Sequence, residues 1–314
     1  MSGVLARVVV ALFALALSST IGAVPASAAP KITLLFTQGA NNLGAYVAKD
    51  QGFFEKHGLD VDVTPTPNGS LISASLVADA AQIGTLTPSI LLEADEQGLD
   101  LVAIAGMTTY PTNSPAAIMA RTGSGVKTAQ DLIGRKVGVP GLGGALDVLA
   151  RNWVKTGGVD YHKVNWVEVQ FPQMVDGLKA GLVDAVVTAE PFNTRIKAVD
   201  AGYFLAEAEG PKGTITLIYA ATRAWTQKNP DALKNFRAAI EDAYAFARNP
   251  ANATSVKESI GKYTKLPPAA MATIVVPDTL QEKVTGPSLA FWVNVARDQG
   301  MIKGNPDPAS LVAP

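Results

Sequence analysis

The chain alternates short apolar runs with segments of helical periodicity, and this alternation restricts its fold more than any other feature. The first apolar run is followed by apolar side chains at helical spacing, up to a stop at Gly58. Pro88 stands at the first position of another predicted helix. Strands are predicted over residues 32–36, 59–63, 82–86 and 101–105. Strands that alternate with helices imply a mostly parallel sheet covered on both faces.

The alternation starts again after a stretch of proline and polar residues at 111–115. Strands are predicted over residues 117–119, 136–139, 164–169, 184–188 and 214–221, and longer helices over 230–248, 252–263 and 279–299. The chain has 314 residues, enough for two units that each bury a hydrophobic core. We therefore expect an α/β protein of two units.

The N-terminus has the pattern of a secretory signal peptide. Arg7 precedes an apolar stretch at residues 8–17, and small residues at 26–28 form a cleavage site. The apolar stretch is shorter than the roughly 20 residues of a membrane-spanning helix. We expect residues 1–28 to be removed, so that a soluble protein is exported.

Composition excludes several classes of function. A net charge of −1 with 17% charged residues leaves no basic excess for phosphates, so we expect no nucleic-acid partner. The chain has no cysteine, which rules out disulfides and a lipid-anchored cysteine. Its two histidines, His57 and His162, are too few for a metal cluster or a nucleophile–base pair. We expect no metal and no cofactor.

A glycine-rich turn at residues 141–145 joins a predicted strand to a predicted helix. Glycine lets a ligand approach bare backbone, and the first N–H groups of a helix have no partner inside it. The turn partly matches a dinucleotide fingerprint, with Glu168 placed like its ribose-binding acid, but Leu146 stands at the last glycine position. The alternative is that the turn packs a helix tightly on a strand.

Two strand ends repeat the same local pattern. Thr85 lies in a strand that leads into a helix opened by Pro88, and Thr188 ends a strand before Pro191. Open α/β sheets place ligands at such strand ends. Two such edges that face one another would form a cleft.

Three segments of the chain resemble the periplasmic substrate-binding proteins of ABC importers in the nitrate, sulfonate, taurine and thiamine-precursor group. They are residues 46–59 (YVAKDQGFFEKHGL), 129–139 (AQDLIGRKVGV) and 184–192 (DAVVTAEPF). The resemblance implies a two-lobed fold of type II, in which each lobe is a mostly parallel sheet flanked by helices and two segments cross between the lobes. Lobe 1 would contain residues 29–115 and 221–314, and lobe 2 residues 116–220, with crossings near 114–117 and 219–222.

The resemblance further implies a non-enzymatic function outside the cytoplasm. A monomer would hold a small-molecule ligand between its lobes and present it to an ABC transporter permease. Carried over from the family, the ligand-binding residues would be Gln38, Gly39, Asn41, Asn42, Thr85, Thr87, Gly143, Gly144, Ala145, Thr188 and Phe192. No Arg or Lys stands clearly in these stretches, so the charge of the ligand stays open.

Each of these assignments has a structural alternative. The three threonines have the residue type that caps helices. Glu190 suits the first turn of a helix through the dipole, and Phe192 suits the core as well as a pocket wall.

Three other functions compete with solute capture. An enzyme related to thiamine-pyrimidine synthase would carry a cysteine-rich motif, which this chain lacks. An exported nucleotide-dependent dehydrogenase would be expected behind a twin-arginine signal, whereas Arg7 stands alone. A ligand-sensing domain of a transcription regulator would need a DNA-binding helix pair, but the N-terminus offers only the export signal.

Overall fold

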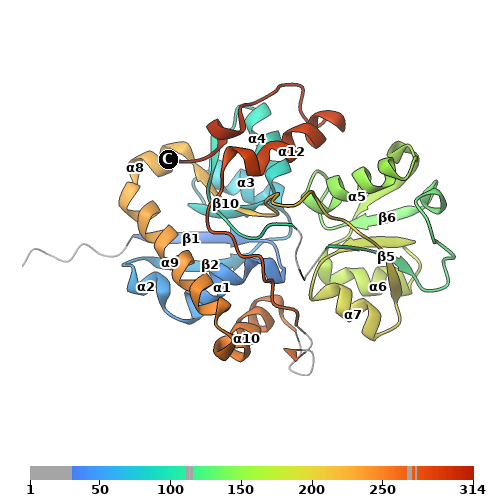
Figure 1. Ribbon diagram of the computed structural model, residues 1–314, viewed down its shortest axis with the longest axis horizontal. Coiled ribbons are helices and arrows are strands. Elements are labelled where there is room, and N and C mark those ends of the chain that lie inside the picture. Colours follow the sequence, from blue (N-terminus) through green and yellow to red (C-terminus); the bar gives the residue numbers. More distant parts are fainter. Residues whose placement is uncertain (1–29, 111–112, 114–115, 267–270, 273) are drawn as a thin grey trace, which may run out of the picture.

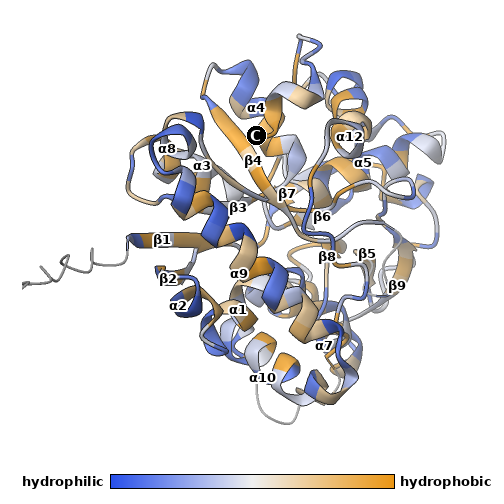
Figure 2. Ribbon diagram, turned by 60° about the vertical axis from the view of Figure 1, so that its left-hand side comes forward, coloured by the Kyte–Doolittle hydropathy of each residue, from blue (hydrophilic) through white to orange (hydrophobic). Residues whose placement is uncertain are grey.

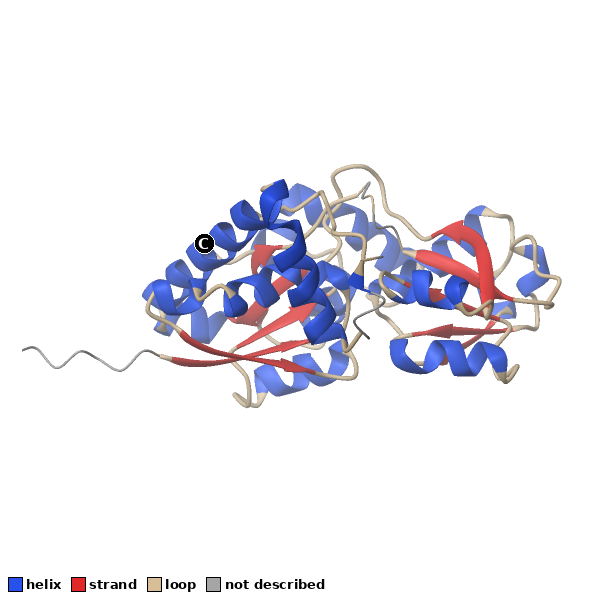
Figure 3. Ribbon diagram, turned by 90° about the horizontal axis from the view of Figure 1, so that it is seen from below, coloured by secondary structure: helices blue, strands red, loops and turns tan. Residues whose placement is uncertain are grey.

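Two β-sheets with helices packed on their faces make up two lobes that lie side by side (Figure 1, Figure 3). The computed structural model describes residues 30–110, 113, 116–266, 271–272 and 274–314. The predicted signal peptide at residues 1–28 lies outside the described residues. Within the described ranges, no helix is both long and apolar enough to cross a membrane.

The first sheet has the strand order β2-β1-β3-β10-β4. Its strands are β1 (Lys31–Phe36), β2 (Asp60–Pro65), β3 (Ile83–Leu86), β4 (Leu101–Gly106) and β10 (Ile218–Thr222). β1 runs parallel to β2 and β3, whereas β10 runs antiparallel to both β3 and β4. The later part of the chain thus supplies one reversed strand to an otherwise parallel sheet.

The second sheet repeats this arrangement with the order β7-β6-β8-β5-β9. Its strands are β5 (Ala117–Arg121), β6 (Lys136–Val139), β7 (Asn165–Glu168), β8 (Ala185–Thr188) and β9 (Gly202–Glu207). Here β5, the first strand along the chain, is the reversed one. The expected two-lobed α/β fold is confirmed, with one antiparallel strand in each sheet.

The helices pack on the sheets, and hydrophilic and hydrophobic residues alternate along them (Figure 2). They are α1 (Leu43–Asp50), α2 (Phe53–Lys56), α3 (Gly69–Val77), α4 (Pro88–Glu96), α5 (Ala145–Thr156), α6 (Met174–Lys179), α7 (Phe192–Ala198), α8 (Arg223–Lys228), α9 (Pro230–Arg248), α10 (Ala253–Thr264) and α12 (Gly286–Asp298). In α9, Leu233, Phe236 and Ile240 recur at helical spacing and are buried. Short 3₁₀ helices add η1 (Ala40–Asn42), η2 (Gln130–Leu132), η3 (Tyr161–Lys163), η4 (Phe171–Gln173), η5 (Pro250–Asn252) and η6 (Pro308–Leu311).

Three local expectations differ from the structure. The helix predicted from residue 279 begins at Gly286, because Thr285 caps it and residues 279–282 pair instead with the segment after β4. The edge strand β9 has no counterpart among the predicted strands. The crossing expected near 219–222 lies earlier in the chain, since these residues belong to β10 of the first sheet.

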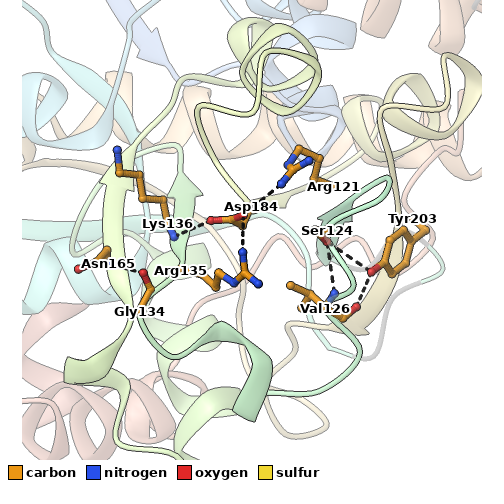
Figure 4. A network of polar contacts seen from close by, with 9 residues as sticks. All are labelled: Arg121, Ser124, Val126, Gly134, Arg135, Lys136, Asn165, Asp184 and Tyr203. Carbon is orange, nitrogen blue, oxygen red and sulfur yellow. Dashed lines mark hydrogen bonds and ion pairs between the residues drawn. The ribbon is translucent and has the colours of Figure 1, made fainter.

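A carboxylate fixes three strands of the second sheet at the edge where β6 and β8 begin (Figure 4). Asp184 accepts from the backbone N–H of Lys136 at 3.2 Å and forms ion pairs with Arg121 and Arg135, each at 3.3 Å. Because these partners lie in β5, in β6 and in the turn before β6, and Asp184 itself directly precedes β8, one side chain connects the ends of three strands.

Helix α12, which lies in the part of the chain expected to form lobe 1, also contacts lobe 2 and ties the two lobes together. The indole Nε1 of Trp292 donates to the carbonyl of Ile215 at 2.8 Å, and Gln299 Nε2 donates to the carbonyl of Val148 on α5 at 2.8 Å. Asp298 forms an ion pair with Lys155, also on α5. The lobes are therefore held close together in this structure.

Replacing Gly84 with alanine should destabilise lobe 1, because a Cβ there would lie 2.2 Å from Cγ2 of Ile72 on α3. We expect Gly84→Ala to lower the free energy of unfolding by about 1–3 kcal/mol. Gly177→Ala on α6 is the matched control, since its Cβ would meet nothing closer than 3.7 Å. Urea unfolding measures both, and equal stability of the two variants would contradict the tight packing of α3 on β3.

Candidate functional site

A cavity lies between the lobes, at the edge where the parallel strands of both sheets end. The space that the centre of a water molecule can reach is about 110 Å³. The lining residues come from both lobes and from the segments between them: Thr37, Gln38, Gly39, Asn41, Asn42, Asn68, Gly69, Thr85, Thr87, Ile90, Tyr110, Ala116, Pro140, Gly141, Gly144, Ala145, Leu146, Phe171, Ala189, Thr216 and Leu217. This is the position where open α/β sheets bind ligands.

Most of the residues predicted for the site line this cavity. Those that do are Gln38, Gly39, Asn41, Asn42, Thr85, Thr87, Gly144 and Ala145. Gly143, Thr188 and Phe192 are next to lining residues, either along the chain or in space, but do not line the cavity themselves. Strand ends that are far apart in the sequence thus meet at one place.

Three lining residues carry buried polar atoms that have no protein partner in the described part of the chain. They are Oγ1 of Thr85, a residue only 1% exposed, Oδ1 of Asn41 and Oδ1 of Asn42. Thr188 at the end of β8 has another such atom and is fully buried beside Ala189. A buried polar atom without a hydrogen bond costs about 1–3 kcal/mol. A polar ligand in the cavity would supply hydrogen-bond partners for these atoms and remove this cost.

Other lining residues brace the loops around the cavity. Thr87 caps α4, with Oγ1 accepting from the N–H of Ile90 at 3.4 Å. Asn42 Nδ2 donates to the carbonyl of Thr37 at 2.8 Å, and the carbonyl of Gly39 accepts from Tyr46 OH at 3.1 Å. The capping alternative therefore describes Thr87, and Asn42 holds the loop after β1.

The glycine turn uses several of its N–H groups internally. Gly143 has φ +75° and donates its N–H to Asp147 Oδ2 at 2.9 Å, while Gly144 donates to the carbonyl of Gly141 at 3.2 Å. Leu142 N–H donates to Glu168 Oε1 at 3.0 Å. Gly143 and Gly144, both expected to bind the ligand, thus already have protein acceptors for their N–H groups. Ala145, the first residue of α5, lines the cavity, and its N–H has no hydrogen-bond partner in the structure as described.

An aromatic pair forms one wall. Phe171 lines the cavity, and its ring stacks on that of Phe192, with centroids 4.9 Å apart and planes 9° apart. Phe192 is only 2% exposed, so it supports Phe171 from behind. The sequence pointed to Phe192 alone, since Phe171 carries no motif beyond a following proline.

The segments that cross between the lobes supply two residues that sequence reasoning missed. Tyr110 follows β4 and Thr216 precedes β10, and the two segments pair through Tyr110 N–H to the Thr214 carbonyl at 3.0 Å. Burial raises the pKa of the Tyr110 phenol, so it stays neutral. Sequence reasoning also missed Asn68. Its position directly before a helix could have indicated it, because Asn68 Oδ1 caps α3 by accepting from the N–H of Leu71 at 3.1 Å.

The cavity wall carries no Lys, Arg, His, Asp or Glu among the described residues, yet carboxylates lie directly behind it. Burial raises the pKa of Glu93, Asp147 and Glu190. For Glu93 the nearby Asp147 charge raises the pKa further, and Arg151 opposes it. The site is thus polar but uncharged, in an acidic surrounding.

Replacing Glu93 with glutamine should remove the loss of folding stability that ionisation of Glu93 causes as the pH rises. Because the folded pKa of Glu93 lies above its ordinary value near 4.5, the folded state binds more protons, and stability falls as the pH rises through this window. We expect Glu93→Gln to be more stable than the wild type at pH 7 and to lose this advantage below about pH 4.5. Urea unfolding at pH 4 to 7 measures it. Glu241→Gln, on the exposed face of α9, is the control for one lost charge, and an advantage that persists at pH 4 would contradict the expectation.

The chain is similar in sequence to known proteins. The chain is 28% identical over 210 residues to the nitrate import ATP-binding protein NrtC of Synechocystis, covering 59% of this chain but only 30% of that protein. It is 27% identical over 217 residues to the formylaminopyrimidine-binding protein of Halalkalibacterium halodurans, covering 67% of this chain and 64% of that one.

Solved structures share the fold. The alkanesulfonate-binding protein SsuA from Xanthomonas axonopodis pv. citri, solved with bound MOPS, superposes with a TM-score of 0.75 at 14% identity, over 90% of this chain and 98% of that one. The sequence pattern of the NMT1/THI5 like family matches residues 40–253. The chain belongs to the NMT1/THI5 like family.

Proposed function

We propose that this protein is an extracytoplasmic solute-binding protein that captures a small organic ligand between its lobes and delivers it to an ABC transporter permease. The observation that carries this proposal is the cavity at the facing strand ends, where Thr85 and Asn41 hold buried polar atoms without a partner. The proposal covers sulfonates, carboxylates and related compounds such as pyrimidines, and it does not depend on the charge of the ligand. A relative named as a formylaminopyrimidine-binding protein and a solved structure named as an alkanesulfonate-binding protein support a role in solute binding.

The proposal includes a location and partners. The signal-peptide pattern at residues 1–28 supports export. One chain forms the whole cavity, which supports a monomer that delivers its ligand to a permease. Lobe 1 would comprise residues 29–115 and 221–314, and lobe 2 residues 116–220. β10 places residues 218–220 in the first sheet, so we propose to move that boundary to the segment between β9 and β10.

An enzymatic function has less support. General acid–base catalysis needs a titratable group poised near neutral pH. Among the described lining residues only the buried Tyr110 titrates, and its raised pKa keeps it neutral. The enzyme related to thiamine-pyrimidine synthase would rely on cysteines, and the chain has none.

The proposed function predicts a compound that co-purifies with the protein. Native mass spectrometry of protein from its host should show a bound small molecule that is released on denaturation. The released compound should bind again in calorimetry and reduce the radius of gyration of ligand-free protein in solution scattering, because the lobes close on it. A saturating ligand that leaves the radius unchanged would argue for a rigid site.

Thr85→Val should weaken binding of that compound without harming the fold. Valine keeps the shape of threonine but removes the hydroxyl that has no protein partner. We expect about a tenfold or greater loss of affinity, because the polar group of the ligand loses its partner. The free protein should unfold at the same temperature or higher. Thr64→Val, on the exposed part of β2, is the control, and wild-type affinity in Thr85→Val would place the ligand elsewhere.

A further inference from the structure

Carboxylates already occupy the hydrogen-bond donors that would otherwise attract an anion at the N-terminus of α5. Asp147 accepts from Gly143 N–H at 2.9 Å, and Glu168 accepts from Leu142 N–H at 3.0 Å. Both residues therefore neutralise the positive end of the helix from within the protein. An anionic ligand at Ala145 would therefore lie near the negative charges of Asp147 and Glu168.

Two further carboxylates lie behind other parts of the wall. Glu190 follows the lining residue Ala189, is 8% exposed, and accepts from Thr194 Oγ1 at 3.0 Å. Glu93 lies one helical turn beyond the lining residue Ile90. Its Oε2 is 2.9 Å from the point where a Cβ on Gly143 would stand. A carboxylate from each lobe thus lies close behind the cavity wall.

The nearby cations do not compensate for these charges inside the cavity. Arg151 is bound to Asp147 Oδ1 at 2.6 Å and lies over the ring of Trp166 at 5.5 Å. Lys197 acts on Glu190 from α7, outside the lining. Lys265 is exposed in an adjoining groove with Gln38 and Phe171, where water screens its charge.

We propose that the cavity selects an uncharged ligand, with Glu93, Asp147, Glu168 and Glu190 acting against anions. This inference rests on the proposed function as a solute-binding protein. The charge of an anion would be desolvated beside like charges without a cation in contact, and both effects oppose binding. A neutral carbonyl, amide or sulfonyl oxygen avoids both and still accepts hydrogen bonds.

The lining also defines the shape of this ligand. Ile90, Leu146, Leu217 and Phe171 offer apolar surface, whereas Thr85 and Asn41 present unpartnered polar atoms. A compact apolar body with a neutral polar end satisfies both. Primary amides and sulfonamides belong to this chemical class, and their acids differ from them mainly in charge.

Matched pairs of probes test the selectivity. We would titrate the full-length mature protein, unfolded and refolded to remove bound compounds, with nicotinamide and nicotinate, benzenesulfonamide and benzenesulfonate, and propanamide and propanoate at pH 7.5. For each pair that binds, the affinity for the neutral member should exceed the affinity for the anion by about tenfold or more. One negative unit charge roughly 10 Å from the anion, at an effective dielectric constant of about 20, gives a repulsion of this size.

Two variants assign the selectivity to the carboxylates. Glu93→Gln and Glu168→Gln keep the side-chain shape, and Glu168→Gln keeps an acceptor for Leu142 N–H. Each should improve the affinity for the anionic member relative to the neutral one, by about threefold or more for Glu93→Gln and by less for the exposed Glu168→Gln. Asp147 is left intact because it also holds Arg151. Glu241→Gln should change neither affinity.

The outcomes separate this inference from the proposed function. Anions that bind as tightly as their neutral partners, or tighter, would overturn the inference while supporting solute capture. Equal ratios in the Glu93→Gln protein and the wild type would overturn the role of the carboxylates. Failure of every neutral probe to bind at millimolar concentration would overturn the inference, whereas the capture function is tested separately by the compound that co-purifies with the protein.

Discussion

The segments that pass between the lobes hydrogen-bond to each other, and the position of the site depends on this pairing. Thr216 N–H donates to the Thr108 carbonyl at 2.8 Å, and an antiparallel bridge joins Thr109 to Ile215. Because the paired segments lead into the reversed strands β5 and β10, the carboxyl ends of the parallel strands in both sheets face one gap. Trp292 on α12 then secures the pair through the Ile215 carbonyl.

The electrostatics of the cavity follow from how the surrounding helices are capped. The N-terminus of α4 is capped by the Thr87 hydroxyl, and that of α5 is matched by Asp147 together with Glu168. Acceptor groups of the protein therefore neutralise much of the positive potential at the helix N-termini that point at the cavity. What remains for a ligand is a set of neutral donors and acceptors, and among the lining residues that lack a partner Thr85 is the most deeply buried.

The sequence predicted much of the cavity lining, in part through the resemblance to a known family and in part because strand ends carry local signals. Thr85 and Thr188 stand before proline-opened helices, and Ala145 follows a glycine turn. It missed Tyr110 and Thr216, because each lies in an irregular segment and gains its place only when two distant parts of the chain pair. It also missed β9, an edge strand that pairs with β5 alone.

By itself the sequence determined most of the order of strands and helices and the two-unit organisation, since these follow from hydrophobic periodicity. Only the tertiary structure decided which backbone donors remain free. Glu168 reaches Leu142 from a different strand, and Glu93 approaches Gly143 from the other lobe. Such contacts join residues far apart in the chain, so no local pattern records them, and they set the charge that a ligand meets.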